Sequence, residues 1–167
     1  LLVGAQAYRE QYGLNAVTLL PVNMYGPRDN FDIATSHVIP ALIRKMEDAR
    51  IGNVKSVELW GDGSPTREFL YVEDCARALR LAEQVYDNPE PLNIGTGAEI
   101  SIRDLASIVA DETGFTGSIK WDSARPNGQP RRALDITKAR DALGFAAETN
   151  LRVGIRATID WYRSART

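Results

Sequence analysis

The sequence predicts an α/β fold, because short apolar segments typical of buried strands alternate with segments whose apolar residues recur at helical spacing. Residues 56–60 and 92–94 show the strand pattern, and residues 101–113 show the helical one. Turn-forming residues separate these segments, as in Gly-Asp-Gly-Ser-Pro over 61–65. No internal repeat or low-complexity run interrupts the alternation. We therefore expect one α/β chain in which only part of a sheet is present.

The composition is that of an ordinary globular protein. The 167 residues are 44% apolar and 25% charged, which is enough to bury a sizeable core. A net charge of −2 does not favour nucleic acid or an anionic membrane, and no apolar run approaches the roughly 20 residues of a membrane span. The single cysteine and single histidine argue against a disulfide framework and a metal site. We expect a cytoplasmic protein without nucleic-acid, membrane or metal partners.

The first segment is predicted to be a helix that ends at Gly13. Leu1, Ala5 and Tyr8 fall near one helical face, and Gly13 can adopt the left-handed conformation that ends helices. Neither an initiator methionine nor an N-cap residue precedes this helix. We interpret it as a helix cut in its middle; a frayed natural terminus is the alternative.

A buried strand is predicted next, over residues 16–20, and it opens into a loop at its carboxyl end. Ligands collect at such strand ends in open α/β sheets. The polar stretch 28–36 predicts a loop. Apolar spacing over 38–46 predicts a helix, with Ser36 as its cap and Pro40 in its first turn.

The central part of the sequence predicts two strands and a long helix. The strands cover residues 56–60 and 68–72. The helix that follows is expected to be capped by Glu73 or Asp74 and to run to about Tyr86.

The last third predicts further alternation of strands and helices. A strand over 92–94 precedes a helix over 101–113, at whose start Ser101 and Asp104 have the spacing of a capping box. The remaining expected elements are a strand over 118–122, an extended basic loop over 125–132, and helices over 137–143 and 151–162.

One glycine-rich turn begins like a dinucleotide-binding fingerprint. Gly95-Thr96-Gly97 follows a predicted strand, and Asp122 ends the next strand, where a ribose-binding acid would stand. Ile100, however, occupies the position where the fingerprint needs a small residue. We interpret the segment as a turn and helix cap.

Three stretches carry a more specific pattern. They are Pro-Val-Asn-Met-Tyr-Gly-Pro-Arg-Asp-Asn-Phe-Asp over 21–32, Ser-His-Val-Ile-Pro-Ala-Leu-Ile-Arg-Lys over 36–45, and the stretch from Trp60 to Asp74. Together they resemble the GDP-L-fucose synthase family, within the extended short-chain dehydrogenase/reductase superfamily, and the resemblance covers nearly the whole chain. The Tyr-Gly-Pro turn alone indicates only the superfamily, so the histidine-bearing stretch is the specific part.

The resemblance implies the carboxy-terminal part of a Rossmann-type enzyme together with its smaller α/β substrate-binding domain. Residues 1–30 would be the last helix and strand of a truncated dinucleotide-binding domain, and residues 31–167 the sugar-nucleotide domain with interleaved segments. It also implies a homodimer for the complete enzyme. The family's glycine-rich loop and its catalytic serine, tyrosine and lysine would lie in the absent half, so this chain alone is predicted to be inactive.

The family's reaction converts GDP-4-keto-6-deoxy-mannose to GDP-L-fucose by epimerisation at C3 and C5 and hydride transfer from NADPH to C4. The keto group acidifies the neighbouring carbons, so an acid and a base that flank the ring can invert them. The family's catalytic histidine maps onto His37, and an imidazole exchanges protons near neutral pH. A capping or surface histidine is the alternative. The family's catalytic cysteine lies upstream, so Cys75 is expected to be a small buried hydrophobe.

The resemblance also implies ligand contacts. Those for the substrate are Lys45 with the adjacent Arg44, Trp60, Arg67, Asn127 and Arg131. Alternatives stay open: Trp60 can pack in the core, Arg67 can pair with Glu68 or Glu73, and loop 125–132 can simply be exposed. The implied contacts to the nicotinamide of NADP are Pro21, Val22, Asn23 and Met24, with His37 in the same neighbourhood.

Two other functions are compatible with the sequence. One is a different sugar-nucleotide epimerase or a 4,6-dehydratase, and the other is a non-catalytic module that binds a nucleotide sugar.

Overall fold

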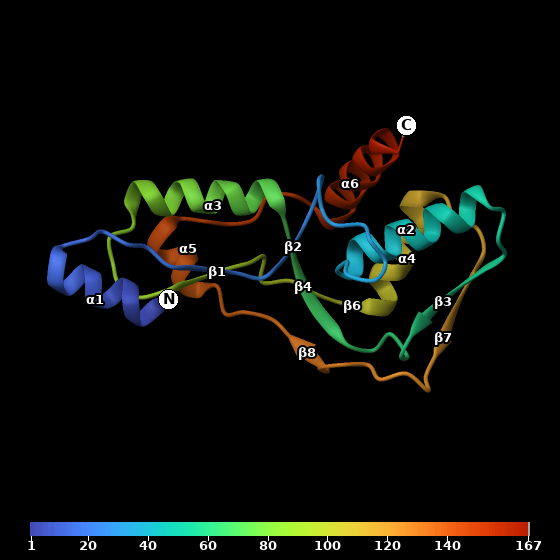
Figure 1. Cartoon of the computed structure of the whole chain (residues 1–167), viewed down its shortest axis with the longest axis horizontal. Coiled ribbons are helices and arrows are strands. Elements are labelled where there is room, and N and C mark those ends of the chain that lie inside the picture. The colour runs from blue at the N-terminus through green and yellow to red at the C-terminus, as the bar shows by residue number, and fades with distance from the viewer. Residues whose placement is uncertain (167) are drawn as a thin grey trace. The chain divides into compact units, whose positions relative to one another are not determined.

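The computed structural model describes residues 1–166, which form two compact units (Figure 1). Unit 1 comprises Leu1–Met24, Glu68–Ala98 and Ala133–Glu148. Within the described residues, unit 2 comprises Tyr25–Arg67, Glu99–Arg132 and the segment 149–166. The expected division into 1–30 and 31–167 differs from this one, because two later segments return to pack with the opening strand. Each unit is therefore built from three separate stretches of chain.

Unit 1 contains three helices and a pair of strands. The strands β1 (Leu19–Pro21) and β5 (Leu92–Ile94) pair in parallel, with Leu19 opposite Leu92. The helices are α1 (Leu2–Tyr12), α3 (Val72–Val85) and α5 (Thr137–Leu143). Figure 1 shows α3 as the long green helix of this unit. Its core is a cluster of buried side chains that includes Val22, Leu70, Ala78, Ala82, Leu92, Ile94, Leu143 and Phe145.

Unit 2 contains three long helices and short strands. The helices are α2 (Val38–Ile51), α4 (Ile102–Thr113) and α6 (Leu151–Ala165). The strands are β3 (Ser56–Trp60), β6 (Glu99–Ser101), β7 (Ser118–Asp122) and β8 (Arg131–Arg132). Helix α4 packs against both α2 and α6, and its buried Leu105 and Val109 are fully covered. The parallel pair β3 and β7 lies side by side in Figure 1.

Two strands begin in one unit and end in the other. Strand β2 (Asn23–Tyr25) starts in unit 1, whereas β4 (Thr66–Tyr71) starts in unit 2. Within unit 2, the first residues of β4 pair in parallel with β8, so that Thr66 lies opposite Arg131.

Several elements confirm the sequence predictions. The strands over 56–60, 92–94 and 118–122 and the helix over 137–143 have the expected bounds. Gly13 ends α1 in the left-handed conformation, with φ of 67°. Ser101 caps α4, because its Oγ accepts a hydrogen bond of 3.0 Å from the Asp104 backbone N–H.

Other expectations differ from the structure at element ends. Strand β1 covers 19–21 rather than 16–20, and β2 and β6 were not predicted. The N-cap of α2 is His37 rather than Ser36, and the Ser36 Oγ is buried without a hydrogen-bond partner among the described residues. Tyr71 precedes α3, so Glu73 and Asp74 lie in its first turn instead of capping it. Carboxylates there still interact favourably with the helix dipole.

Within the part of the chain that the structure describes, no helix is both long and apolar enough to cross a membrane.

Candidate functional site

His37 stands at the N-cap of α2 in unit 2. Its backbone is extended (φ −74°, ψ 172°), and its side chain makes no capping hydrogen bond. The residue is exposed, and within residues 1–166 no hydrogen bond or ion pair to its imidazole is recorded. The side chain therefore does not cap the helix, whereas the alternative of a surface histidine agrees with its exposure.

The loop before His37 is held by a chain of short-range hydrogen bonds. The Asp29 Oδ1 accepts from the Asn30 N–H (2.7 Å), and the Asn30 Oδ1 accepts from the Asp32 N–H (3.0 Å). The Asp32 Oδ1 then accepts from the Ala34 N–H at 3.1 Å. Such side-chain-to-backbone bonds favour turns over regular structure. The Asp-Asn-Phe-Asp sequence thus shapes the loop that leads to His37.

Trp60 lies at the carboxyl end of β3, directly opposite Asp122 at the end of β7. Its side chain is 65% exposed, so the core-packing alternative is wrong. The guanidinium carbon of Arg125 lies 5.1 Å from the centre of the indole ring, and the Arg125 Nε is 3.7 Å from the Asp122 Oδ2. One face of Trp60 therefore takes part in a cation–π contact.

Asn127 attaches the basic loop to the turn after β3. Its Oδ1 accepts a hydrogen bond of 2.8 Å from the Asp62 N–H. Gly61 has φ of 77°, and a Cβ placed there would lie 2.1 Å from the Asn127 Oδ1. Hydrogen bonds to the Asp62 carboxylate, first from the backbone of Ser64 and then from its hydroxyl, hold the Asp62 pKa below its usual value, and Asn127 adds to this effect. Asn127 is thus engaged in holding its loop.

Arg67 is half-buried at the start of β4. Its Nη1 donates to the Thr66 carbonyl at 2.7 Å, and no carboxylate among residues 1–166 forms an ion pair with it. Its Nη2 lies 3.8 Å from where a Cβ on Gly128 would stand, so the loop that carries Asn127 passes beside it. A half-buried guanidinium that lacks a carboxylate partner is suited to an anionic ligand.

The three other predicted substrate contacts already have partners within unit 2. The Arg131 Nε lies 3.0 Å from both carboxylate oxygens of Glu99. The hydrogen bond from Arg131 is the main cause of a lowered Glu99 pKa. The Lys45 Nζ donates to the Glu58 carbonyl at 3.3 Å, and the Arg44 Nη1 donates to the Phe31 carbonyl at 2.9 Å. A ligand would therefore have to compete for each of these cations.

The structure brings Trp60, Arg67 and Asn127 together around the loop after β7, and we call these three residues the strand-end cluster. No recorded contact links His37 to these three residues within the described chain. Sequence reasoning overlooked Asp122 and Arg125 as the residues that support Trp60. The sequence did offer an indication, because residues 56–60 and 118–122 both predict five-residue strands. If these strands pair in parallel, Trp60 and Asp122 lie beside each other at their carboxyl ends.

The predicted nicotinamide segment lies in unit 1 and is only partly available. The buried Val22 donates its N–H to the Ile94 carbonyl at 2.8 Å, and the Asn23 Nδ2 donates to the Glu68 carbonyl at 3.0 Å. Pro21 is exposed, and Met24 is 45% exposed. Both side chains are accessible, whereas Val22 and the Asn23 amide are held within unit 1.

The turn that resembles a dinucleotide fingerprint is occupied by a carboxylate of the protein itself. Glu68 is fully buried, and its Oε1 accepts from the backbone N–H groups of Thr96 (2.6 Å) and Gly97 (2.8 Å). Its Oε2 accepts from the Leu134 N–H at 3.0 Å. The backbone donors that a pyrophosphate needs are therefore already satisfied, which confirms the turn interpretation. The turn over residues 95–97 therefore does not fit the pyrophosphate of a dinucleotide.

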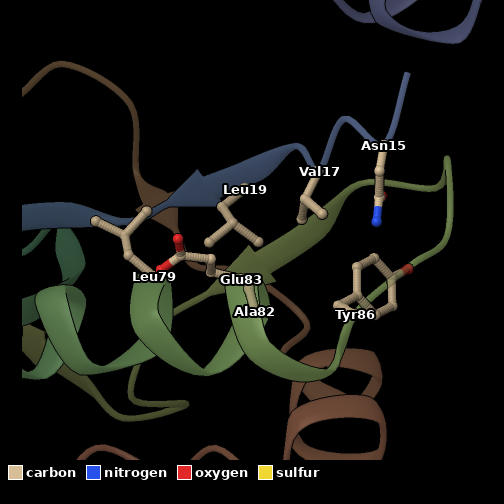
Figure 2. A pocket seen from close by; sticks show the side chains of 7 residues that line it. All are labelled: Asn15, Val17, Leu19, Leu79, Ala82, Glu83 and Tyr86. Atoms are coloured by element: carbon tan, nitrogen blue, oxygen red, sulfur yellow. The ribbon is translucent and has the colours of Figure 1, made fainter. Parts of the chain in front are cut away.

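Unit 1 also contains a surface cavity of about 360 Å³. Figure 2 shows Val17 and Leu19 projecting toward α3, which contributes Leu79, Ala82 and Glu83. Asn15 and Tyr86 complete its lining, and none of the predicted site residues takes part. The cavity is therefore separate from the residues that carry the proposed chemistry.

Cys75 is buried in α3, as expected for a structural residue, and burial raises the pKa of its thiol. Among residues 1–166 no group of three or more His, Cys, Asp or Glu side chains can hold a metal ion.

The parallel strand pairs and the alternation of strands and helices are those of an α/β protein. The chain belongs to the NAD dependent epimerase/dehydratase family, whose model matches residues 3–95, more than half of the chain. It is related in particular to GDP-L-fucose synthases. It is 45% identical to that of Sinorhizobium fredii over 159 residues, which cover 95% of this chain and 50% of the relative.

Two further comparisons place the chain among extended short-chain dehydrogenase/reductase structures and enzymes. The structure of a GDP-L-fucose synthetase from Naegleria fowleri superimposes with a TM-score of 0.92 at 27% identity, covering 99% of this chain and 52% of that one. The same Naegleria protein has been solved bound to NADP. A dTDP-4-dehydro-6-deoxy-D-allose reductase from a Streptomyces species is 38% identical over 160 residues, covering 95% of this chain and 47% of the relative. The chain spans about half the length of the curated relatives it matches.

Proposed function

We propose that this chain supplies the sugar-nucleotide site of a cytoplasmic, NADP-dependent GDP-L-fucose synthase. The longer enzyme that contains this sequence would convert GDP-4-keto-6-deoxy-mannose to GDP-L-fucose by 3,5-epimerisation and reduction at C4. The observation that carries the proposal is His37, an exposed imidazole without a capping bond that follows the Asp-Asn-Phe-Asp turn. The relatedness to GDP-L-fucose synthases supports it.

In the proposed reaction His37 acts as one acid/base group of the epimerisation. The 4-keto group lowers the pKa of the C–H groups at C3 and C5. Each carbon can therefore lose its proton to a base on one face of the ring and regain one from an acid on the other face. An imidazole serves either role near neutral pH, because it gives and takes a proton there. Its exposure lets it approach a bound sugar ring without first breaking an intramolecular bond.

The nucleotide part of the substrate would bind at the strand-end cluster. The exposed face of Trp60 can stack on guanine or the sugar, and Arg67 can hold a diphosphate oxygen with its planar guanidinium. Asn127 would act on the substrate through its loop, since its Oδ1 is taken by the Asp62 N–H. Three further cations would add positive charge near the diphosphate once a bound substrate replaces their internal hydrogen-bond partners. They are Lys45, Arg44 and Arg131.

The cofactor of the proposed enzyme is NADP, whose reduced form, NADPH, would supply the hydride for C4. Pro21 and Met24 would pack on the nicotinamide ring, while Val22 and Asn23 would hold the strand end in place. The proposed complete enzyme is a homodimer. The exposed α1, which contains no buried residue, is available for that contact.

The proposal is tested with the longer enzyme that contains this sequence. GDP-4-keto-6-deoxy-mannose and NADPH in deuterated water should yield GDP-L-fucose that carries deuterium at C3 and C5. His37→Gln should reduce deuterium incorporation by about 100-fold or more, while substrate affinity stays within about threefold. Lys55→Gln, which alters an exposed cation of the same unit, is the matched control. Deuterium incorporation by His37→Gln at the parental rate would contradict the assignment.

A second candidate is another enzyme that acts on a nucleotide-linked sugar, such as a sugar-nucleotide epimerase or a 4,6-dehydratase, the latter forming a 4-keto-6-deoxy sugar as its product. The similarity to a Streptomyces dTDP-sugar reductase favours this candidate over unrelated chemistries. Comparing turnover of GDP-linked and dTDP-linked 4-keto-6-deoxy sugars separates the two. A non-catalytic binding module would instead bind GDP, measured by calorimetry with this chain, and give no turnover in the longer enzyme.

A further inference from the structure

A ring of contacts in unit 2 joins the loop over residues 29–36 to α2 and α6. Phe31, from the loop, stacks on Tyr162 of α6, with ring centres 4.3 Å apart and planes inclined by 21°. It also stacks on Trp161, at 6.0 Å and 28°. Tyr162 is 7% exposed, so it provides a fixed platform for the Phe31 ring.

The backbone of Phe31 is held by α2. Its carbonyl accepts from the Arg44 Nη1 at 2.9 Å, and the Arg44 Nε lies 3.6 Å from the Asp48 carboxylate. Asp48 accepts from the Arg166 Nη1 at 2.8 Å. Arg166 returns to Tyr162, since its Nη1 donates to the phenol oxygen at 3.2 Å and its guanidinium lies 5.2 Å from the ring centre. We call these five residues the Phe31 circuit.

Phe31 is the point at which the loop is attached to the helices. All other recorded hydrogen bonds of residues 29–36 stay within the segment 26–36. These bonds define the shape of the loop but do not fix where it lies on the unit. The stacked ring and the carbonyl of Phe31 supply the recorded contacts that do so.

The position of the loop matters because it ends where α2 begins. His37 follows the loop and is the N-cap of α2, so its ϕ and ψ depend on the direction from which the loop arrives. Its side chain makes no hydrogen bond that would hold it independently of the backbone. The direction of the imidazole therefore depends on the loop.

We infer that Phe31 is a positioning residue for His37, acting through the circuit that fixes loop 29–36 on α2 and α6. The expected effect of Phe31 on catalysis rests on the proposed function, whereas its expected effect on the position of loop 29–36 does not. Half-exposed ion pairs such as Arg44–Asp48 hold little by themselves. The stack of Phe31 on the buried Tyr162 holds the loop rigidly. The charged side chains of Arg44, Asp48 and Arg166 join α2 to the end of α6 beside this stack.

The first test uses this chain and the fact that it contains one histidine. With ¹³C-labelled histidine, the ring of His37 gives one set of NMR signals. Phe31→Ala should shift and broaden them, Phe31→Tyr should restore them, and Arg44→Met should shift them in the same direction as Phe31→Ala. The matched control is Phe115→Ala, which removes a buried ring of the same unit outside the circuit. It should lower the melting temperature and leave the His37 signals in place.

Unchanged His37 signals in both Phe31→Ala and Arg44→Met would overturn the inference, as would equal changes in Phe115→Ala. The use of Arg44→Met keeps the test decisive if Phe31→Ala does not fold.

The second test uses the longer enzyme. Phe31→Ala should slow deuterium incorporation at C3 and C5 by about tenfold, mainly through kcat, with KM within about threefold. Phe31→Tyr should recover most of the rate. A loss confined to KM would contradict a positioning role. A parental enzyme without activity on GDP-4-keto-6-deoxy-mannose would refute the proposed function and leave the NMR result standing.

Discussion

The carboxylate of Glu47 is 1% exposed among the three helices of unit 2 and offers a quantitative test of how they are held together. Its Oε1 accepts from the Arg163 Nη2 at 2.6 Å, and its Oε2 accepts from the Arg50 Nη2 at 2.8 Å. Arg163 also donates to the Thr113 carbonyl at 2.9 Å, so α2, α4 and α6 meet at these side chains. The perturbation is to remove each side of this ion pair separately.

Arg163→Met should destabilise unit 2 by about 3–5 kcal/mol, because it removes two hydrogen bonds to a buried carboxylate and leaves Arg50 as its only recorded arginine partner among the described residues. Glu47→Gln should cost only about 1–2 kcal/mol. The amide fills the same volume, and the two arginine side chains are 40% and 39% exposed, so water can solvate them. The double variant should be less destabilised than the sum of the two, since the buried charge is gone.

The difference in unfolding free energy between the parental chain and Arg163→Met should also depend on pH. Burial, the largest influence on Glu47, opposes ionisation, but the hydrogen bonds from Arg163 and Arg50 outweigh it and keep its pKa below the usual value. The parental stabilisation is therefore complete above the ordinary glutamate pKa and is lost as the pH falls through the lower pKa of the folded state. In Arg163→Met, burial is no longer offset by Arg163, so the Glu47 pKa should rise. The gap between parent and variant should then narrow as the pH falls from 7 to 5.

The assay is urea unfolding followed by tryptophan fluorescence. All three tryptophans, Trp60, Trp121 and Trp161, lie in unit 2, so the signal reports that unit alone. A larger loss for Glu47→Gln than for Arg163→Met, or a gap that does not narrow at pH 5, would refute a buried, paired carboxylate as the source of the stability.

Two further predictions concern single side-chain oxygens. Glu68→Gln should destabilise unit 1 by about 1–3 kcal/mol, because an amide with one oxygen cannot accept all three backbone bonds; hydrogen exchange at Thr96 and Gly97 should accelerate, and unchanged exchange would contradict the role of Glu68. Asn127→Asp should place a second carboxylate beside that of Asp62, whose pKa is already low mainly through the backbone hydrogen bond from Ser64. Hydrogen exchange of the Asp62 backbone N–H should then be faster than in the parent at pH 7 and should approach the parental rate as the pH falls. A difference in exchange rate that does not depend on pH would argue against charge repulsion.

The fold could be predicted where a segment is long enough to show a period. Residues 56–60 and 118–122 alternate over five positions, and their strands have the expected bounds. Strands β2 and β6 have three residues each and run directly into the expected loop and helix, whereas the equally short β5 follows the chain-breaking Asn-Pro-Glu-Pro over 88–91. The Ser101 cap was predictable because its partner Asp104 is three residues away.

The site could be predicted only in part, for the same reason of sequence distance. His37 and its loop are recognisable because the pattern is continuous in the sequence. Glu68 reaches Leu134 across 66 residues, and nothing local indicates that its carboxylate fills a backbone turn. Trp60 is likewise ambiguous in sequence, since a strand-end tryptophan is buried or exposed according to which strand lies beside it.

The interleaving of the two units has a consequence for how this chain is made. Unit 1 is not complete until residue 148 has been synthesised, and unit 2 takes its last helix from residues 151–165. Residues 1–148 must therefore have left the ribosome before all segments of the unit 1 core are available to pack. Strand pairs such as Leu19 with Leu92 join distant residues, and contacts of this kind slow folding. Neither unit can be obtained by expressing one contiguous stretch of the gene, and a chaperone that shields apolar segments would act on nearly the whole nascent chain.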